Sequence, residues 1–245
     1  MNKKIEQAVK LLKHSKYTIV LTGAGVSVES GIPPFRDKGG LWTQYDPIVL
    51  ELDYFLKNPE ISWPVIKKLF YDFYGQIKPN EAHYGLARLE KKGIIKTVIT
   101  QNIDNLHQKA GSQNVYEFHG TLQSLSCLEC GTEYLIQKVN LNETVPRCQK
   151  DNGLLKPNFV FFKEGIPQHV AVQSFAETQK ADVVLVIGTT GEVMPACAIP
   201  YKAQMHGATI IEINPNLSNY TNSITEVFLK GKATEMMKAL ELKIS

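Results

Sequence analysis

The chain has 245 residues, of which 43% are hydrophobic, enough to bury an α/β core with or without an insertion. Its net charge of +3 is small and its lysines are spread along the chain, so we expect no nucleic-acid partner. Residues 1–16 lack the apolar run of an export signal and no later segment could span a membrane, so we expect a cytoplasmic protein.

Short apolar runs rich in β-branched residues alternate with helical segments, which is the pattern of parallel strands joined by crossover helices. Residues 1–16 begin this pattern with an amphipathic helix. Almost uniformly apolar runs such as residues 182–189 predict strands covered by helices on both faces. We therefore expect a doubly wound sheet with strands at residues 17–22, 95–100, 114–118, 158–162, 182–189, 208–214 and 226–230.

Two segments interrupt this alternation. Residues 36–79 are rich in aromatic residues and prolines without a strand pattern, and residues 121–155 hold three of the four cysteines. We interpret both as insertions over one edge of the sheet. The predicted core is therefore discontinuous and comprises residues 1–35, 80–120 and 156–245.

The first motif follows the first predicted strand and reads GAGVS at residues 23–27. Glycines there let a pyrophosphate approach the backbone, where free N–H groups and a helix N-terminus offset its charge. Val28 occupies the third glycine position of the dehydrogenase motif, which argues against an ordinary nicotinamide dehydrogenase. The alternative is a tight strand-to-helix turn without a ligand. The candidate cofactor contacts are Gly23, Ala24, Gly25 and Ser27.

The motif continues into SGIPPFR at residues 30–36 and then into the pair Gly39 and Gly40. Together these strings resemble the sirtuin family of NAD-dependent protein deacylases, with its G-A-G-x-S, S-G-I-P and F-R elements. The resemblance extends to about residue 240 and implies NAD as cosubstrate. Phe35 and Arg36 would then supply an apolar wall and a cation near the ribose and phosphates, in a loop that closes over NAD. Standing alone, Arg36 would be interpreted as a solvated charge.

The second motif reads TQNIDNLH at residues 100–107, at the carboxyl end of a predicted strand, where open α/β sheets bind ligands. It resembles the family element T-Q-N-I-D-x-L-H. The resemblance implies that Asn102 and Asp104 orient the nicotinamide and its ribose, beside Gln101 and Ile103. From the residues alone, Asn102 or Asp104 could equally cap the following helix.

A third motif, Phe118-His119-Gly120, ends another predicted strand. An imidazole titrates near neutral pH and can take a proton from a ribose hydroxyl. The resemblance places the catalytic base at His119, whereas His107 is expected to pack on a helix face.

The cysteines follow the ligand spacing of a zinc ribbon, with Cys127 and Cys130 as C-x-x-C and Cys148 after 17 residues. The family has a second C-x-x-C, whose last position is Asp151 here, so the resemblance implies a structural zinc on three sulfurs and one oxygen. A ribbon held by packing without metal is the alternative. The predicted fold class is thus α/β, a Rossmann-like doubly wound parallel sheet with a small inserted zinc-ribbon and helical module.

Residues 155–164 resemble the family segment that pairs with the substrate peptide and lines the acyl-lysine tunnel. A buried core strand is equally compatible with the pattern. Lys163 stands where the family has a glycine, and Gly191-Glu192 replaces apolar residues, so the peptide preference stays open. The candidate walls of the tunnel are Val160, Phe161 and Phe162.

Three later strand-end motifs match the adenosine side of the family pattern. As isolated turns they would carry little information. The candidate contacts are Gly188, Thr189, Thr190, Asn214, Pro215, Asn216 and Ala233.

The resemblance implies an NAD-dependent protein-lysine deacetylase or deacylase that releases nicotinamide and O-acyl-ADP-ribose from an acylated protein or peptide. Neutral acyl groups are favoured, because the tyrosine and arginine of the desuccinylase branch would fall near Ile66 and Leu69. Zinc would be structural only, and a monomer is expected. Two alternatives remain, an NAD glycohydrolase or ADP-ribosyltransferase using the same pocket and a non-catalytic NAD-binding sensor.

Overall fold

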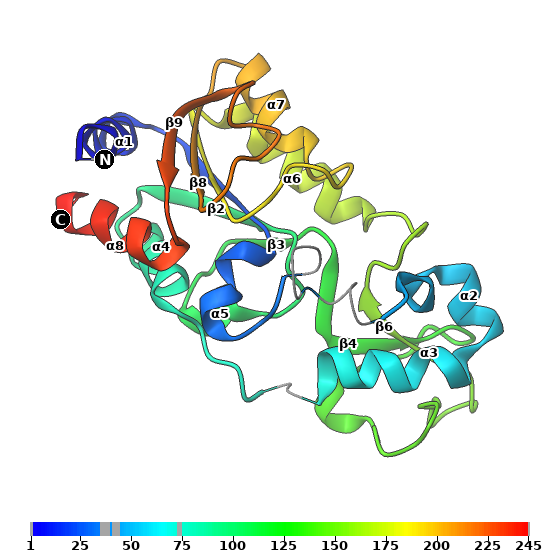
Figure 1. The fold of residues 1–245 in the computed structure, drawn as a ribbon. Helices are drawn as coiled ribbons and strands as arrows, with labels where there is room; N and C mark the ends of the chain where they lie inside the picture. The colour runs from blue at the N-terminus through cyan, green and yellow to red at the C-terminus, as the bar shows by residue number, and fades with distance from the viewer. Residues whose placement is uncertain (1, 35–39, 41–44, 73–74, 245) are drawn as a thin grey trace.

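The computed structural model describes residues 2–34, 40, 45–72 and 75–244. Within them, the larger sheet has six parallel strands in the order β3-β2-β1-β7-β8-β9. The chain enters at the centre, moves outward to β3, and then crosses to β7 on the other side of β1 (Figure 1). The strand order therefore reverses between β1 and β7, where open α/β sheets bind their ligands. The strands are β1 Thr18–Thr22, β2 Ile95–Thr100, β3 Val115–Glu117, β7 Val183–Ile187, β8 Thr209–Asn214 and β9 Thr225–Lys230.

Helices cover both faces of this sheet, as the uniformly apolar strands predict (Figure 1). One face packs against α1 (Asn2–His14), α4 (Glu81–Lys91) and α8 (Ala233–Ile244). The other packs against α6 (Gln168–Lys180) and α7 (Ala198–Met205). The predicted doubly wound α/β fold is confirmed.

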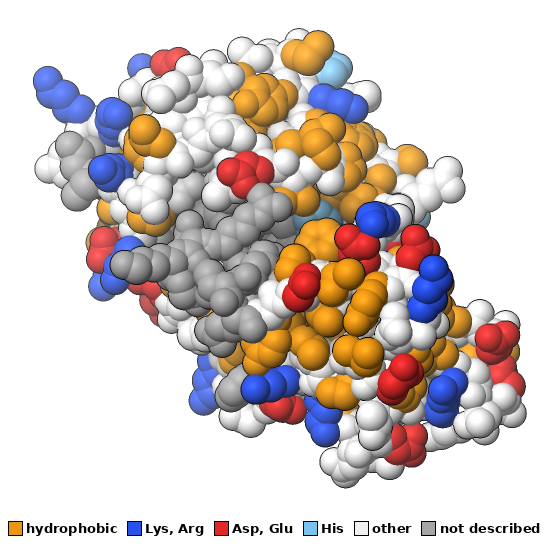
Figure 2. Space-filling model, turned by 45° about the vertical axis from the view of Figure 1, so that its right-hand side comes forward, with side chains coloured by type: hydrophobic (Ala, Val, Ile, Leu, Met, Phe, Trp, Pro, Cys, Tyr) orange, Lys and Arg blue, Asp and Glu red, His pale blue; other side chains and the backbone are white. Residues whose placement is uncertain are grey.

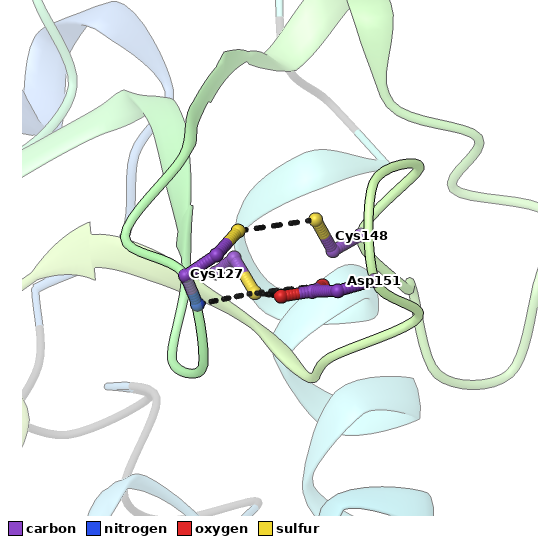
Figure 3. Close-up of side chains that lie close together, drawn as sticks. Cys127, Cys148 and Asp151 are labelled. Atoms are coloured by element: carbon purple, nitrogen blue, oxygen red, sulfur yellow. Dashed lines mark hydrogen bonds between the residues drawn. The ribbon is translucent and has the colours of Figure 1, made fainter.

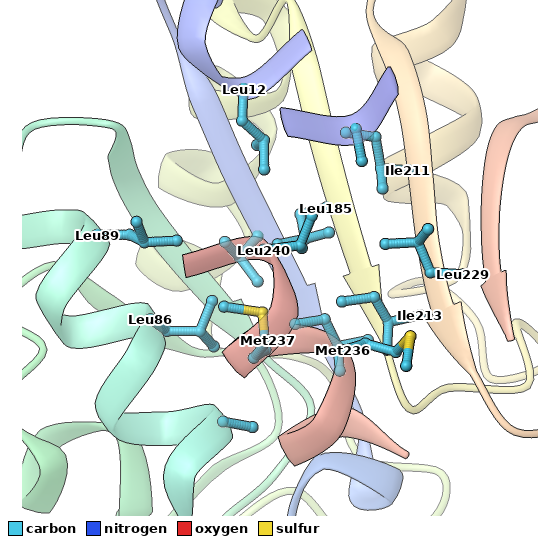
Figure 4. Packing of buried hydrophobic residues seen from close by; sticks show 14 of the residues in the cluster. Leu12, Leu86, Leu89, Leu185, Ile211, Ile213, Leu229, Met236, Met237 and Leu240 are labelled. Carbon is cyan, nitrogen blue, oxygen red and sulfur yellow. The ribbon is translucent and has the colours of Figure 1, made fainter. Parts of the chain in front are cut away.

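The alternation of strand side chains divides the core between these two layers. Leu185 of β7 packs in one cluster with Leu12 and Leu240 on one face of the sheet (Figure 4). Its neighbour Val186 belongs to the cluster on the other face, which includes Ile199 of α7. Each such fully buried side chain contributes roughly 1.5–3 kcal/mol relative to exposure. This rigid sheet fixes the positions of the strand ends.

A small lobe, residues 45–72 and 120–164, lies beside the sheet (Figure 1). It contains a three-stranded antiparallel sheet in the order β5-β4-β6. Its own aromatic core centres on Trp63, whose indole donates to the Leu155 carbonyl oxygen at 3.0 Å. Its elements are η4 Pro47–Leu50, α2 Leu52–Lys57, α3 Pro59–Ile66, the π-helical turn η5 Lys67–Tyr71, β4 Gly120–Cys127, β5 Glu133–Leu135, η6 Ile136–Lys138 and β6 Leu155–Phe159.

The strand predicted at residues 158–162 is wrong in position and in partner. It lies at Leu155–Phe159 and pairs antiparallel with β4, in the small sheet instead of the parallel one. An apolar run of residues predicts that a strand is buried, but it does not predict which sheet the strand joins. Here the aromatic core of the small lobe buries it, since Phe159 and Phe161 stack with ring centroids 4.8 Å apart.

The remaining described elements are short: η1 Ala24–Val26, η2 Val28–Ser30 and α5 Leu106–Ala110. None of the helices in the described ranges combines the length and apolar character needed to cross a membrane. One face of the molecule gathers hydrophobic side chains bordered by acidic and basic ones (Figure 2).

Candidate active site

The loop after β1 packs directly on the loop after β7. The Gly23 amide donates to the Ile187 carbonyl oxygen at 3.0 Å, and the Gly25 amide donates to that of Gly188 at 2.9 Å. A Cβ on Gly25 would lie 2.6 Å from the Gly188 Cα. The glycines are therefore required for backbone-to-backbone packing at the point where the strand order reverses.

Three polar side chains meet at this edge and form what we call the strand-edge cluster: Ser27, Asn102 and Asp104. The Ser27 hydroxyl donates to Asp104 Oδ2 at 2.7 Å and accepts from Asn102 Nδ2 at 3.1 Å. Asn102 is only 6% exposed, and burial raises the pKa of Asp104 against the effect of its hydrogen bonds. The sequence motifs after β1 and β2 are thus brought together.

Asp104 also has a structural role. Its Oδ1 accepts from the Leu106 amide at 2.9 Å, at the start of α5. One carboxylate oxygen therefore faces Ser27 while the other caps the helix, so the capping alternative and the ligand-binding prediction are compatible for this residue.

Two buried histidines lie against this cluster. His107 Nε2 is 2.9 Å from the Thr22 hydroxyl, and His83 Nε2, from α4, is 3.4 Å from the Ser27 hydroxyl, with the two rings 4.9 Å apart. Burial lowers the pKa of His83 to about 4 and also lowers that of His107, so both are neutral at neutral pH. His107 packs as predicted. His83 was not singled out from the sequence, because a lone histidine outside a motif is usually a packed or surface residue. In the structure it also takes part in the capping box of α4 with Asn80.

His119 lies between β3 and β4, with its ring anchored to the neighbouring strand end. Its Nδ1 is 3.0 Å from the Gln101 carbonyl oxygen. Because a carbonyl oxygen only accepts, Nδ1 carries the hydrogen and Nε2 keeps its lone pair. Burial lowers the pKa of His119, opposed by the bond to Gln101, so the neutral ring predominates near neutral pH. This imidazole can accept a proton through Nε2.

The adenosine-side motifs meet at the same edge through Thr189. Its hydroxyl accepts from Gln101 Nε2 at 3.0 Å, and its carbonyl oxygen accepts from Asn214 Nδ2 at 2.9 Å. The residues that directly follow Thr189 and Asn214 in the chain are exposed; they are Thr190, Pro215 and Asn216. Ala233 is the first residue of α8. Phe35 and Arg36 lie outside the described residues.

The candidate substrate walls differ in exposure. Val160 is half-buried and its amide donates to the His119 carbonyl oxygen at 2.8 Å, which ties this segment to the histidine. Phe161 is 2% exposed and belongs to the aromatic core, where its ring centroid is 5.0 Å from that of Phe55. Phe162 is 42% exposed.

The predicted zinc ligands converge in the small lobe and form what we call the ligand cluster: Cys127, Cys130, Cys148 and Asp151. One ligand atom from each lies within 4.8 Å of all the others (Figure 3). A tetrahedral zinc with Zn–S bonds of about 2.3 Å holds two sulfurs about 3.8 Å apart. The Cys130 and Cys148 sulfurs are 3.7 Å apart, and the Cys127 sulfur is 3.4 Å from Asp151 Oδ1. The donor set fits a closed structural site.

Two similar turns supply these ligands. In the first, Gly131 follows the second ligand with φ of 69°, and in the second, Asn152 follows Asp151 with φ of 60°. The Cys130 amide donates to the Cys127 sulfur at 3.5 Å and the Lys150 amide donates to the Cys148 sulfur at 3.4 Å. Asp151 thus occupies the position in the second turn that Cys130 has in the first.

Comparison with known proteins identifies a family and close relatives for this chain. The model of the Sir2 family matches residues 23–195. The NAD-dependent protein deacylase of Thermococcus sibiricus is 43% identical over 98% of this chain and 96% of its own length. That of Pyrococcus furiosus is 44% identical, covering 94% of each chain.

Solved structures give the same result. A complex of a Sir2 homologue with NAD is 39% identical and superposes with a TM-score of 0.90 over 98% of this chain and 93% of its own. A Sir2 complex with a p53 peptide and NAD+ is 34% identical, with a TM-score of 0.91 over 98% of both chains. The chain belongs to the Sir2 family.

Proposed function

We propose that this chain is an NAD-dependent protein-lysine deacylase that produces nicotinamide and O-acyl-ADP-ribose. The observation that carries the proposal is the 3.0 Å contact of His119 Nδ1 with the Gln101 carbonyl oxygen, which puts the hydrogen on Nδ1 and the lone pair on Nε2. A neutral imidazole bonded to Gln101, the residue that precedes Asn102 of the strand-edge cluster, is suited to general-base catalysis on a sugar hydroxyl. Family membership and the deacylase relatives support the same activity.

NAD supplies an electrophilic ribose carbon from which nicotinamide leaves when the acyl oxygen of the modified lysine attacks. In this proposal His119 Nε2 takes the proton of a ribose hydroxyl, while Asn102 and Asp104 orient the nicotinamide end. The hydrogen bond that His119 Nδ1 donates to the Gln101 carbonyl oxygen holds the imidazole plane during this transfer. The reaction consumes one water and frees the lysine amine, so all acyl atoms end on the sugar.

The full set of proposed contacts extends along the edge of the sheet. The NAD contacts are Gly23, Ala24, Gly25, Ser27, Phe35, Arg36, Gln101, Asn102, Ile103, Asp104, Gly188, Thr189, Thr190, Asn214, Pro215, Asn216 and Ala233. The acyl-lysine contacts are Val160, Phe161 and Phe162, and the zinc ligands are Cys127, Cys130, Cys148 and Asp151.

An acylated peptide as second substrate is supported by the relative whose structure contains a peptide with NAD+. Neutral acyl groups, a monomeric state, a cytoplasmic location and the absence of a nucleic-acid or membrane partner stay predictions from the sequence. So does the division into a discontinuous core (1–35, 80–120, 156–245) with insertions at 36–79 and 121–155.

The test is product analysis by mass spectrometry after incubation with NAD and an acetyl-lysine peptide. Wild type should form O-acetyl-ADP-ribose, and His119→Ala should lower the rate roughly 10²- to 10⁴-fold. His206→Ala is the matched control, because His206 is exposed and bonds the Lys202 carbonyl oxygen at 2.7 Å. Nicotinamide release without peptide would instead identify a glycohydrolase or ADP-ribosyltransferase. NAD binding with no turnover in wild type or variant would identify a sensor.

A further inference from the structure

Lys156 of β6 is a buried lysine that the proposed chemistry does not use. Its side chain is 8% exposed, and Nζ lies 3.0 Å from the Pro157 carbonyl oxygen, 3.0 Å from that of Phe159 and 2.9 Å from Glu164 Oε2. An ammonium has three hydrogens, and three acceptors surround this one. Burial lowers the pKa of Lys156, and the Glu164 carboxylate opposes that shift.

The ammonium organises the chain that follows it. Glu164 Oε2 also accepts from the Phe161 amide at 2.8 Å, and Lys156 Nζ lies 4.3 Å from the centre of the Phe161 ring. Attraction between a cation and an aromatic face adds to these bonds. Residues 159–164 are therefore wrapped around one buried positive charge.

This wrapped segment connects two other parts of the molecule. The Val160 amide donates to the His119 carbonyl oxygen at 2.8 Å. On the other side the Phe162 amide donates to the Leu50 carbonyl oxygen at 2.8 Å, and the Leu52 amide donates to that of Phe162 at 3.1 Å. Residues 160–162 thus hydrogen-bond to His119 on one side and to the segment before α2 on the other. The Lys156–Glu164 pair contacts this same segment through the Phe159 carbonyl oxygen and the Phe161 amide.

We infer that Lys156 and Glu164 are positioning residues for the acyl-lysine substrate, holding residues 159–164 in the shape that meets it. The inference rests on the proposed function, because it assigns the substrate to this segment. Burying the ammonium of Lys156 beside a partly exposed carboxylate is an inefficient way to gain stability alone, since apolar residues of similar volume often do as well. Here the pair instead fixes the backbone of residues 159–164, which is bonded to the His119 carbonyl oxygen.

The experiment measures KM for an acetyl-lysine peptide and, separately, the Kd of NAD by calorimetric titration. Lys156→Met should raise the peptide KM roughly tenfold or more, because small displacements of a positioning segment weaken productive binding. Glu164→Gln should raise it about threefold and Lys156→Arg should restore most of the loss. NAD affinity should stay within about twofold of wild type in all three, since the strand-edge cluster is untouched. Lys243→Met, which removes an exposed pair with Glu6, is the matched control.

A melting curve for each variant separates positioning from stability. A lowered Tm with an unchanged peptide KM at 25 °C would overturn the inference. Should Lys156→Met fail to fold, Glu164→Gln decides alone, and an unchanged KM there also overturns it. If wild type itself forms no O-acetyl-ADP-ribose, the proposed function fails. If wild type turns over but the variants keep the wild-type peptide KM, only the inference about Lys156 and Glu164 fails.

Discussion

The strand-edge cluster and the ligand cluster are assembled by opposite means. At the strand edge Ser27, Asn102 and Asp104 are bonded to one another at 2.7 and 3.1 Å, on loops fixed by a buried parallel sheet. In the ligand cluster the contacts between Cys127, Cys130, Cys148 and Asp151 involve sulfur, a weak donor and acceptor. Protein packing therefore preorganises the first cluster, whereas the donor atoms of the second are arranged so that a metal ion could join them.

Metal removal is the change expected to have the largest effect, and it tests this difference directly. A chelator, or Cys148→Ser, should speed amide hydrogen exchange in β4 and β6 about a hundredfold or more, because metal binding is coupled to folding of such modules. Exchange in β1 and β7 should stay slow. Cys197→Ser, at a buried cysteine outside the ligand cluster, should keep the wild-type metal content. Equal acceleration in both sheets would show that the lobes do not differ in this way.

Acid should act on the strand edge through His83. Its pKa is about 4 in the folded protein against 6.5 as an ordinary value, so the unfolded chain takes up the proton first. The stabilising contribution of the neutral ring is complete above pH 6.5 and is lost as pH falls towards 4, amounting to about 3 kcal/mol. Denaturant unfolding across this range should give a flatter pH dependence for His83→Gln than for wild type. Parallel curves would mean that His83 is solvated in solution.

The oxygen ligand of the ligand cluster can be exchanged for sulfur. Asp151→Cys should slow zinc loss to a chelator roughly tenfold, because thiolates hold zinc more tightly than a single carboxylate. Asp151→Asn should speed it. Release followed with a colorimetric zinc indicator measures both, and equal rates for the three proteins would remove Asp151 from the ligand set.

The smallest effect is expected at Lys163, which has φ of 68° and an exposed ion pair with Glu51 at 2.6 Å. Lys163→Gly relieves the left-handed backbone and removes the pair, two changes of opposite sign. The Tm should therefore change by only about 2 °C or less. A large drop in Tm would mean that the exposed pair of Lys163 with Glu51 contributes far more to stability than surface ion pairs usually do.

Much of the sheet and of the ligand cluster could be predicted from the sequence because both have local signals. Apolar runs marked the strands of the parallel sheet, and C-x-x-C spacing marked the first turn of the ligand cluster. The resemblance to the family marked Asp151 as the residue in the place of a thiolate. The motif after β2 was found at the strand end where the structure brings Asn102 to Ser27.

Other features depend on contacts far apart in the chain. β4 has polar residues among its apolar ones, so its sequence reads as part of a loop-rich insertion. Lys156 looks like an exposed lysine until Glu164 and the carbonyl oxygens around it are known. His83 carries a capping signal, and only tertiary packing places it against Ser27, 56 residues away.

Gly120 has φ of 76°, and a Cβ there would lie 2.1 Å from the Asn158 carbonyl oxygen, so no other residue fits without moving β6. This glycine starts β4, the first strand of the small lobe, and directly follows His119. This tight contact with β6 is thus one peptide unit from the imidazole. A methyl group at position 120 would therefore displace β6 and His119 relative to each other, so the accuracy with which the base is placed depends on the smallest residue of the chain.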